Sequence, residues 1–413
     1  MDDGISTKAS IEAMSDIGTL GELPGNSRGV LFALAAAAGL AVANLYYNQP
    51  VLGLIASDLG VGTHIGLLTT VTQLGYTLGL ILLVPLCDTL DRRSLILVLC
   101  GLLVAASAVG AIAGNLFVLL CSAAGMGVTA TITQMVVPMA ADVVSSDERG
   151  KAIGVAFSGA LSGILLARVV SGAVGQLFGW RASFWMATAL AVCLWGLLGL
   201  TLPRLPRKSD LSYKELLGSM LQLLIDFPGL RYACAIQAFV FGAFSAFWSV
   251  LALYLQGEPF RLGPGVAGAF GLVGVVGVLA AQAGGRLTDR YGARSGVLTG
   301  TLACVASFAL MGLTHSLALL IVEVVILDAG VALAQVSNQS LILGLSEAAR
   351  GRINTVYVTA IFFGGALGSA LASYGWSHAR WTGVVATGGG MSALALLGYF
   401  ASRRAGIAGT RAS

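Results

Sequence analysis

Charge is scarce in this chain. Only 10% of its 413 residues are charged and 57% are hydrophobic, whereas soluble domains carry about 25% charged residues. Apolar runs of roughly 20 residues recur along the whole length, and a helix of that length can cross a bilayer. The composition excludes a soluble fold and predicts an all-α membrane protein.

Signatures of metal, redox and nucleotide chemistry are also missing. The six cysteines have no CxxC spacing, and the three histidines form no metal-ligand pattern. We therefore expect no disulfide framework, no metal and no cofactor. No Walker lysine loop occurs, which argues against ATP as an energy source. The spans hold no nucleophile–base constellation, so we do not expect an enzyme. We also expect no nucleic-acid partner.

The apolar runs predict about twelve transmembrane helices, arranged as six plus six. The first span is expected over 28–50 and the seventh over 230–256. The first residues hold no signal-peptide pattern, so we expect the first span to be retained. The predicted units are an N-terminal tail over 1–27, a six-helix lobe over 28–202, a linker with a surface helix over 203–229, a second lobe over 230–402 and a tail over 403–413.

The basic residues indicate the orientation of the chain. With the N-terminus inside, 19 of the 23 Lys and Arg fall in cytoplasmic segments, as the positive-inside rule requires. Outer loops hold three, Arg181, Arg261 and Arg380, and Arg168 lies within a span. We expect a multi-pass protein of the bacterial cytoplasmic (inner) membrane with both termini cytoplasmic.

Two charged islands occur twice, 201 residues apart, in loops predicted to face the cytoplasm. A large fixed-period repeat indicates duplicated architecture, and in a membrane it indicates a two-lobed transporter with its site between the lobes. The first island contains Asp88, Arg92 and Arg93, and its second copy contains Asp289, Arg290 and Arg294. The second island begins with Arg149, and its second copy begins with Arg350.

The first of these islands, in both copies, resembles the signature loop of the major facilitator superfamily (MFS), roughly G-x-x-x-D-R-x-G-R-R. The second copy, which runs from Gly285 to Arg294, is the better match; in the first, Val84 and Asp91 replace the two glycines. Tyr-Asn-Gln-Pro at 47–50 resembles a bacterial branch of the same superfamily. The resemblance implies two pseudo-symmetric six-helix lobes and alternating access. It also implies that the islands form a gate that closes the cytoplasmic side; the alternative is that their arginines only set topology.

Three charged residues lie inside predicted spans. Each costs at least about 2.5 kcal/mol unless it faces a polar cavity or a partner. Asp328 is the candidate proton-coupling carboxylate, with a structural ion pair as the alternative. Arg168 has no repeat counterpart, because Ser369 stands at the equivalent position; it is a candidate for anion binding or for pairing with a carboxylate. Glu323 lies about 140° around the helix from Asp328 and is a weaker candidate.

Polar residues within the spans predict a central cavity. Asp328, Gln335 and Gln339 share one helix face, and the repeat maps Gln335 onto Gln134. The alternatives are hydrogen bonds between neighbouring helices and an interfacial aromatic belt. The remaining substrate-cavity candidates are Asn44, Tyr47, Asn48, Gln73, Trp248, Asn354 and Tyr357.

These patterns predict a secondary active transporter, expected as a monomer in the lipid bilayer with a small-molecule substrate. We expect proton-coupled efflux of a small amphipathic compound or metabolite, since the chain resembles the drug and metabolite efflux branch. The alternatives are an importer or facilitator of a small polar metabolite, and a non-transporting membrane sensor with a transporter fold.

Overall fold

The computed structural model describes residues 25–202, 212–275, 279, 292–313, 316–347 and 349–405. Asp289 and Arg290, in the second copy of the first island, lie outside these residues. Two hydrophobic cores organise the chain, one built from residues between Leu31 and Leu202 and the other from residues between Met220 and Tyr399. Two cores in one chain are what a two-lobed protein requires.

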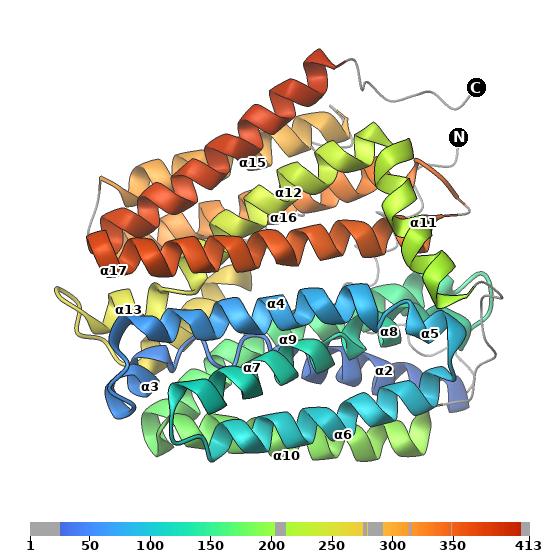
Figure 1. The fold of residues 1–413 in the computed structure, drawn as a ribbon, viewed down its shortest axis with the longest axis horizontal. Coiled ribbons are helices and arrows are strands. Elements are labelled where there is room, and N and C mark those ends of the chain that lie inside the picture. The colour runs from blue at the N-terminus through green and yellow to red at the C-terminus, as the bar shows by residue number, and fades with distance from the viewer. Residues whose placement is uncertain are drawn as a thin grey trace.

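The first lobe is built entirely from helices (Figure 1). Its helices are α2 (Gly25–Ala43), α3 (Leu52–Asp58), η2 (Gly62–Gly66), α4 (Leu67–Leu82), α5 (Leu86–Thr89), α6 (Arg92–Ala111), α7 (Leu116–Ala130), α8 (Ile132–Met139), η3 (Ala140–Asp142), α9 (Arg149–Phe178) and α10 (Trp180–Thr201).

The second lobe follows the amphipathic helix α11 (Tyr213–Asp226), which begins with a capping box between Ser212 and Glu215. The last element, α17, consists of two helices joined at a kink, because Ala379 and Arg380 have non-helical backbone angles. The helices of this lobe are α12 (Pro228–Trp248), α13 (Leu251–Gln256), the helix Pro264–Val275, α15 (Ala293–Met311), α16 (Leu317–Leu343) and α17 (Arg350–Arg404).

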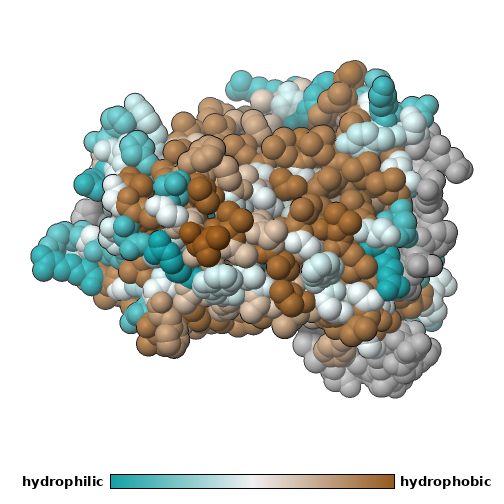
Figure 2. Space-filling view, turned by 60° about the horizontal axis from the view of Figure 1, so that its bottom comes forward, coloured by the Kyte–Doolittle hydropathy of each residue, from teal (hydrophilic) through white to brown (hydrophobic). Residues whose placement is uncertain are grey.

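The helices account for about twelve membrane crossings, as predicted. Nine helices in the described part of the chain are long and apolar enough to span a bilayer, and α17 contains two of the crossings. Two shorter apolar helices, Gly29–Ala43 and Pro264–Val275, complete the set. On the face in Figure 2, hydrophobic residues cover the middle and hydrophilic residues gather toward the two ends. This is the surface of a protein embedded in lipid.

The first span is not one helix over 28–50, because α2 ends at Ala43 and the chain turns through 44–50. The side chain of Asn44 donates to the carbonyl of Leu40 at 2.8 Å, and its backbone N–H bonds to Ala41 instead. Pro50 then lacks an N–H that could continue a helix. In the second lobe the chain breaks again between α12 and α13, so each lobe begins with an interrupted helix.

Both short helices that follow these breaks, α3 and α13, lie at the same end of the molecule, on the left in Figure 1. We call this the α3–α13 end. The opposite end carries α5 and α11 (Figure 1), and we call it the α5–α11 end.

Candidate functional site

The two lobes are joined by hydrogen bonds between α4 and the second lobe. The Thr70 hydroxyl donates to the Ser369 hydroxyl at 3.1 Å, and the Gln73 amide donates to the Ser245 hydroxyl at 3.2 Å. A Cβ at Gly66, in the short helix just before α4, would overlap the side chain of Ser373. These contacts lie in the half of the lobe boundary that is nearer the α3–α13 end.

A glycine seam brings the lobes together at a second place. A Cβ at Gly172 of α9 would lie 2.9 Å from the Cα of Gly268, on the helix Pro264–Val275. A Cβ at Gly268 would overlap the carbonyl of Arg168. The backbones of these helices are therefore in direct contact, as small residues permit in membrane proteins. The lobes are closed against each other in the α3–α13 half.

Arg168 lies at this closed boundary and is only 2% exposed. Its Nε donates to Oε1 of Gln49 at 2.9 Å. The guanidinium carbon lies 4.0 Å from the ring centroid of Trp248 in the opposite lobe and 4.6 Å from that of Tyr46. Among the described residues, its Nη2 has no hydrogen-bond partner. The charge is therefore held largely by aromatic faces, an arrangement that is favourable when water is excluded.

Asp328 lies near the middle of α16 and is 8% exposed. Its Oδ1 accepts a hydrogen bond from Nε1 of Trp248 at 3.3 Å. A Cβ at Gly274 would lie 2.9 Å from Oδ2, so glycine leaves room for the carboxylate. Asp328 and Arg168 interact electrostatically, but no direct ion pair joins them in the described part of the chain. The indole of Trp248 contacts both.

Glu323 belongs to a different environment from Asp328. It is 3% exposed and acts electrostatically on Tyr254 of α13, whose ring stacks on Trp381 at 3.8 Å. Its carbonyl accepts from Ser307. Glu323 therefore lies at the edge of an aromatic cluster near the α3–α13 end.

Three of the candidates in the first lobe contact neighbours on other helices of that lobe. Asn48 donates to the Thr72 hydroxyl at 3.0 Å, and Gln134 donates to the Tyr76 hydroxyl at 3.2 Å. The carbonyl of Tyr47 accepts a short hydrogen bond from the Ser171 hydroxyl. The side-chain amide of Asn44 donates to two carbonyls of its own helix, those of Leu40 and Ala41.

The polar candidates of the second lobe form a group on α16 and α17. Gln339 donates to Oδ1 of Asn354 at 2.8 Å, and the Tyr357 hydroxyl donates to the carbonyl of Gln335 at 3.2 Å. The structure thus brings Gln335, Gln339, Asn354 and Tyr357 together, in a group separate from the Asp328–Trp248 bond.

A row of aromatic rings connects the Asp328–Trp248 pair with the Gln134–Tyr76 pair. It starts at Trp248 and reaches Tyr76, the partner of Gln134, through rings 4.3 to 5.9 Å apart. The rings belong to helices of both lobes, so the row lies along the lobe boundary. In order, they are Trp248, Phe244, Phe241, Phe362 and Tyr76.

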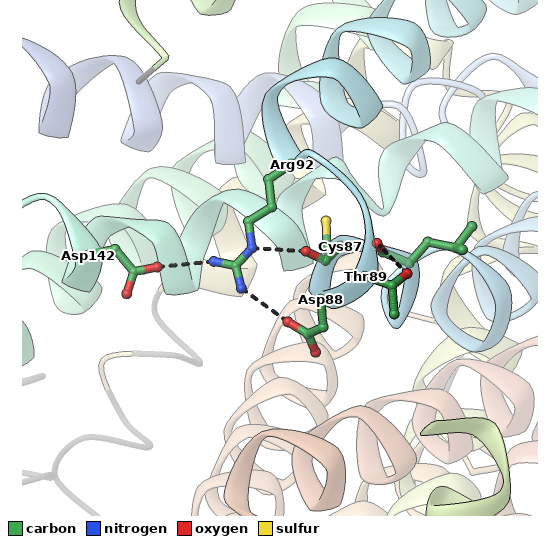
Figure 3. A network of polar contacts seen from close by, with 6 residues as sticks. Cys87, Asp88, Thr89, Arg92 and Asp142 are labelled. Carbon is green, nitrogen blue, oxygen red and sulfur yellow. Dashed lines mark hydrogen bonds and ion pairs between the residues drawn. The ribbon is translucent and has the colours of Figure 1, made fainter. Parts of the chain in front are cut away.

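The first island forms a network within its own lobe (Figure 3). Arg92 is buried, and its guanidinium bonds to Asp88 and Asp142, both at 3.1 Å, and to the carbonyl of Cys87. Arg93 donates to the carbonyl of Gly199 at 2.7 Å. These contacts fix the start of α6 against α5, η3 and α10.

The other described island residues lie on the surface. Arg149 begins α9, and Arg350 pairs with Glu347 at 3.2 Å. Arg294 is exposed and lines a cavity of about 680 Å³ within the second lobe, beside Arg403 and Tyr399. In this conformation, the contacts given for Arg92, Arg93 and Arg350 all stay within one lobe.

Sequence reasoning missed three residues that complete these sites. Gln49 supports Arg168, and its position in the Tyr-Asn-Gln-Pro motif was a usable signal. Asp142 binds Arg92 from 50 residues away, and no local pattern indicates that contact. Gly274 makes room for Asp328, and nothing sets it apart from the other glycines of the sequence.

The fold and the site define a class of protein: a helical membrane protein of two lobes, with ionisable and aromatic side chains at the boundary between them. The sequence profile of the Major Facilitator Superfamily matches residues 34–284 and again 233–412. The chain therefore belongs to this superfamily and is a membrane transporter.

Known proteins that resemble the chain agree with this assignment. The uncharacterized transporter YgaY of Escherichia coli O157:H7 is 35% identical over 373 residues, which cover 90% of this chain and 95% of YgaY. The Streptomyces coelicolor protein named "Probable transporter SCO4007" is 35% identical, with coverage of 86% and 83%. Neither name specifies a substrate.

Solved structures show the same fold at low sequence identity. A bacterial homolog of the human lysosomal transporter Spinster, in an inward-facing and unoccupied conformation, superposes with a TM-score of 0.76 at 18% identity, with coverage of 92% of this chain and 98% of the homolog. A peptide transporter, POT, gives a TM-score of 0.75 at 14% identity, with coverage of 98% and 99%.

Proposed function

We propose that this transporter exports a small amphipathic compound in exchange for protons, and that Asp328 carries the proton. The observation that carries the proposal is the environment of Asp328: a carboxyl group inside the membrane, at the lobe boundary, with a neutral indole as its hydrogen-bond donor. A carboxylate that is costly to hold charged, and that no direct ion pair neutralises in the described part of the chain, is suited to reversible protonation.

The orientation proposed for the chain follows from its basic residues. We assign the α5–α11 end to the cytoplasm because Arg92, Arg93, Arg149 and Arg350 lie there. The closed α3–α13 half then faces the outside of a bacterial inner membrane, both termini are cytoplasmic, and the lobes span 28–202 and 230–402. We propose that the protein works as a monomer.

The aromatic row supports an amphipathic substrate. Phe241, Phe244 and Phe362 offer apolar faces along the boundary, while Gln339 and Asn354 offer hydrogen-bonding groups. Apolar surface with a few placed polar groups is the usual composition of a small-molecule site. Export is favoured because apolar rings outnumber charges at the boundary, whereas a polar metabolite would need more polar partners.

Proteoliposomes that enclose a pH-sensitive dye test this proposal. The purified protein is challenged with amphipathic drugs, amino acids and sugars, under an imposed pH gradient of either sign. We expect substrate-dependent proton movement in the opposite direction to the substrate. Asp328→Asn should abolish this coupling, whereas Glu323→Gln, a change at the other buried carboxylate of α16, should retain it.

The outcomes separate the alternatives. Proton and substrate movement in the same direction would replace export with import. Transport of a compound without any proton response would remove the coupling role of Asp328.

A further inference from the structure

We propose that Trp248 transmits the protonation state of Asp328 to the closure of the two lobes, so that the ionised carrier without substrate stays closed at the α3–α13 end. This inference rests on the proposed role of Asp328 as the proton carrier. It gives Trp248 the function of a positioning residue, in place of the substrate contact that its sequence context suggests.

The geometry around Trp248 is the basis of this assignment. Its indole Nε1 donates to Asp328 in its own lobe at 3.3 Å, and its ring lies 4.0 Å from the guanidinium carbon of Arg168 in the other lobe. Trp248 is 2% exposed, so both contacts are shielded from water. One side chain therefore connects the acidic group of one lobe with the basic group of the other.

The connection is stronger when Asp328 is ionised. A hydrogen bond to a carboxylate is stronger than one to a neutral carboxyl group, and it fixes the plane of the indole against Arg168. The negative charge also attracts Arg168 across the ring. Protonation of Asp328 weakens both effects, so the boundary at Arg168 should open more readily.

Few other groups that can carry charge face this arrangement. Within the described part of the chain, Tyr46 on the segment after α2 faces Arg168, and Cys304 on α15 faces Asp328. Glu323 on α16 acts on Tyr254 instead. Asp328 is therefore the acidic group that we expect to control the position of Trp248.

Closure at Arg168 has a direct consequence for coupling. The glycine seam places the backbone of Gly268 against the carbonyl of Arg168, so any separation of the lobes must move Arg168 away from Trp248. When Asp328 is ionised and no substrate is bound, the lobes stay closed at the α3–α13 end, so the empty carrier cannot change conformation. This prevents proton leakage without transport.

Thiol accessibility tests the inference without any substrate. Ser373 is buried and lies against Gly66 of the other lobe, so Ser373→Cys reports opening of the α3–α13 half to a membrane-impermeant maleimide. The exposed cysteines, Cys121 and Cys193, are replaced by serine. The full chain is placed in nanodiscs, and the rate for Ser57→Cys, at an exposed position, corrects for thiol ionisation.

We expect slow labelling at pH 8 and labelling about tenfold faster at pH 5, because the charge-assisted hydrogen bond is lost on protonation. Trp248→Phe keeps an aromatic ring and removes the N–H, so its labelling should be fast at both pH values. Asp328→Asn should behave in the same way.

The chain supplies a matched control. Trp180 donates to Asp58 at 3.0 Å, and the guanidinium carbon of Arg181 lies 4.3 Å from its ring, but all three residues belong to the first lobe. Trp180→Phe should therefore label like the parent protein. Gel filtration of each variant confirms that it is folded.

Labelling of Trp248→Phe that matches the parent at both pH values would overturn the inference, and so would parent labelling that does not change with pH. Proton movement in liposomes is scored separately. Its absence would remove the proposed exchange mechanism, while the labelling result still decides whether Trp248 links Asp328 to lobe closure.

Discussion

The side-chain amide of Gln73 and the hydroxyl of Ser245 lie 3.2 Å apart across the boundary between the lobes. Gln73 is in α4 and Ser245 is in α12, and both are buried. A neutral hydrogen bond of this kind contributes about 1 kcal/mol. That is enough to bias an equilibrium between two conformations but not to lock it, which suits the proposal that this boundary opens and closes during transport.

Gln73→Ala should shift the lobes toward separation at the α3–α13 end by about fivefold, since one hydrogen bond of about 1 kcal/mol is lost. Spin labels at Ser57 and Glu258, near the ends of α3 and α13, measure the separation by double electron–electron resonance. The population at longer distances should grow. The control is Thr188→Ala, which removes a bond to Ser107 inside the first lobe; an equal shift in this control would contradict the prediction.

Gly268→Ala should prevent full closure of the lobes. The added methyl group would overlap the carbonyl of Arg168, and backbone atoms cannot move aside as a flexible side chain can. We expect the transport rate to fall by at least about tenfold, the effect of a steric cost of about 1.4 kcal/mol, while the protein remains folded.

Uptake or efflux assays at matched expression measure the effect of Gly268→Ala. Gly196→Ala serves as the control, because a Cβ there meets nothing within 4 Å. Normal transport by Gly268→Ala would mean that the seam is not part of the transport cycle.

Arg92→Met should destabilise the first lobe by about 2–3 kcal/mol, because three hydrogen bonds from a buried cation are lost together. Asp88 and Asp142 are partly exposed, and water can solvate the carboxylates that remain, so the loss should stay below that of a fully buried pair. Thermal unfolding in detergent measures the change. Arg149→Met, at the exposed start of α9, should leave the melting temperature nearly unchanged.

The fold could be predicted from the sequence because hydrophobicity alone decides which segments cross a membrane. The twelve crossings and the repeat required only local runs and spacing. The break after Ala43 was not predicted. The side chain of Asn44 donates to the carbonyl of Leu40, and this local hydrogen bond competes with the backbone hydrogen bonds of a helix that the sequence pattern would otherwise continue. Apolar composition does not reveal such local competition.

The site was predicted less completely than the fold. Asp328 and Arg168 stood out because charge inside a span is costly, and the structure places both at the lobe boundary. Their connection through Trp248 depends on how α9, α12 and α16 pack. The spacing of residues in the sequence does not predict that packing. From the sequence alone, Trp248 could not be distinguished from an aromatic residue that contacts the substrate.

Asp58, the last residue of α3, should make the stability of the protein depend on pH. Hydrogen bonds from Arg181 at 2.6 Å and from Trp180 hold the pKa of this carboxyl below its ordinary value of 3.8. A folded-state pKa that is lowered adds stability above the unfolded-state pKa, and this stability is lost as the pH falls through the folded-state pKa. The charged form of Asp58 should therefore stabilise the protein at neutral pH and cease to do so in strong acid.

Asp58→Asn should lower the melting temperature at pH 7 slightly, since the pair is exposed and screened, and the difference from the parent should vanish in strong acid, below the lowered folded-state pKa of the carboxyl. Thermal unfolding in detergent across a pH range of about 2–7 provides the measurement. The same substitution made in an Arg181→Met background should have a smaller effect at pH 7, because the main partner of the carboxylate is already gone. A difference that persists unchanged in strong acid would show that Asp58 acts through packing and not through its charge.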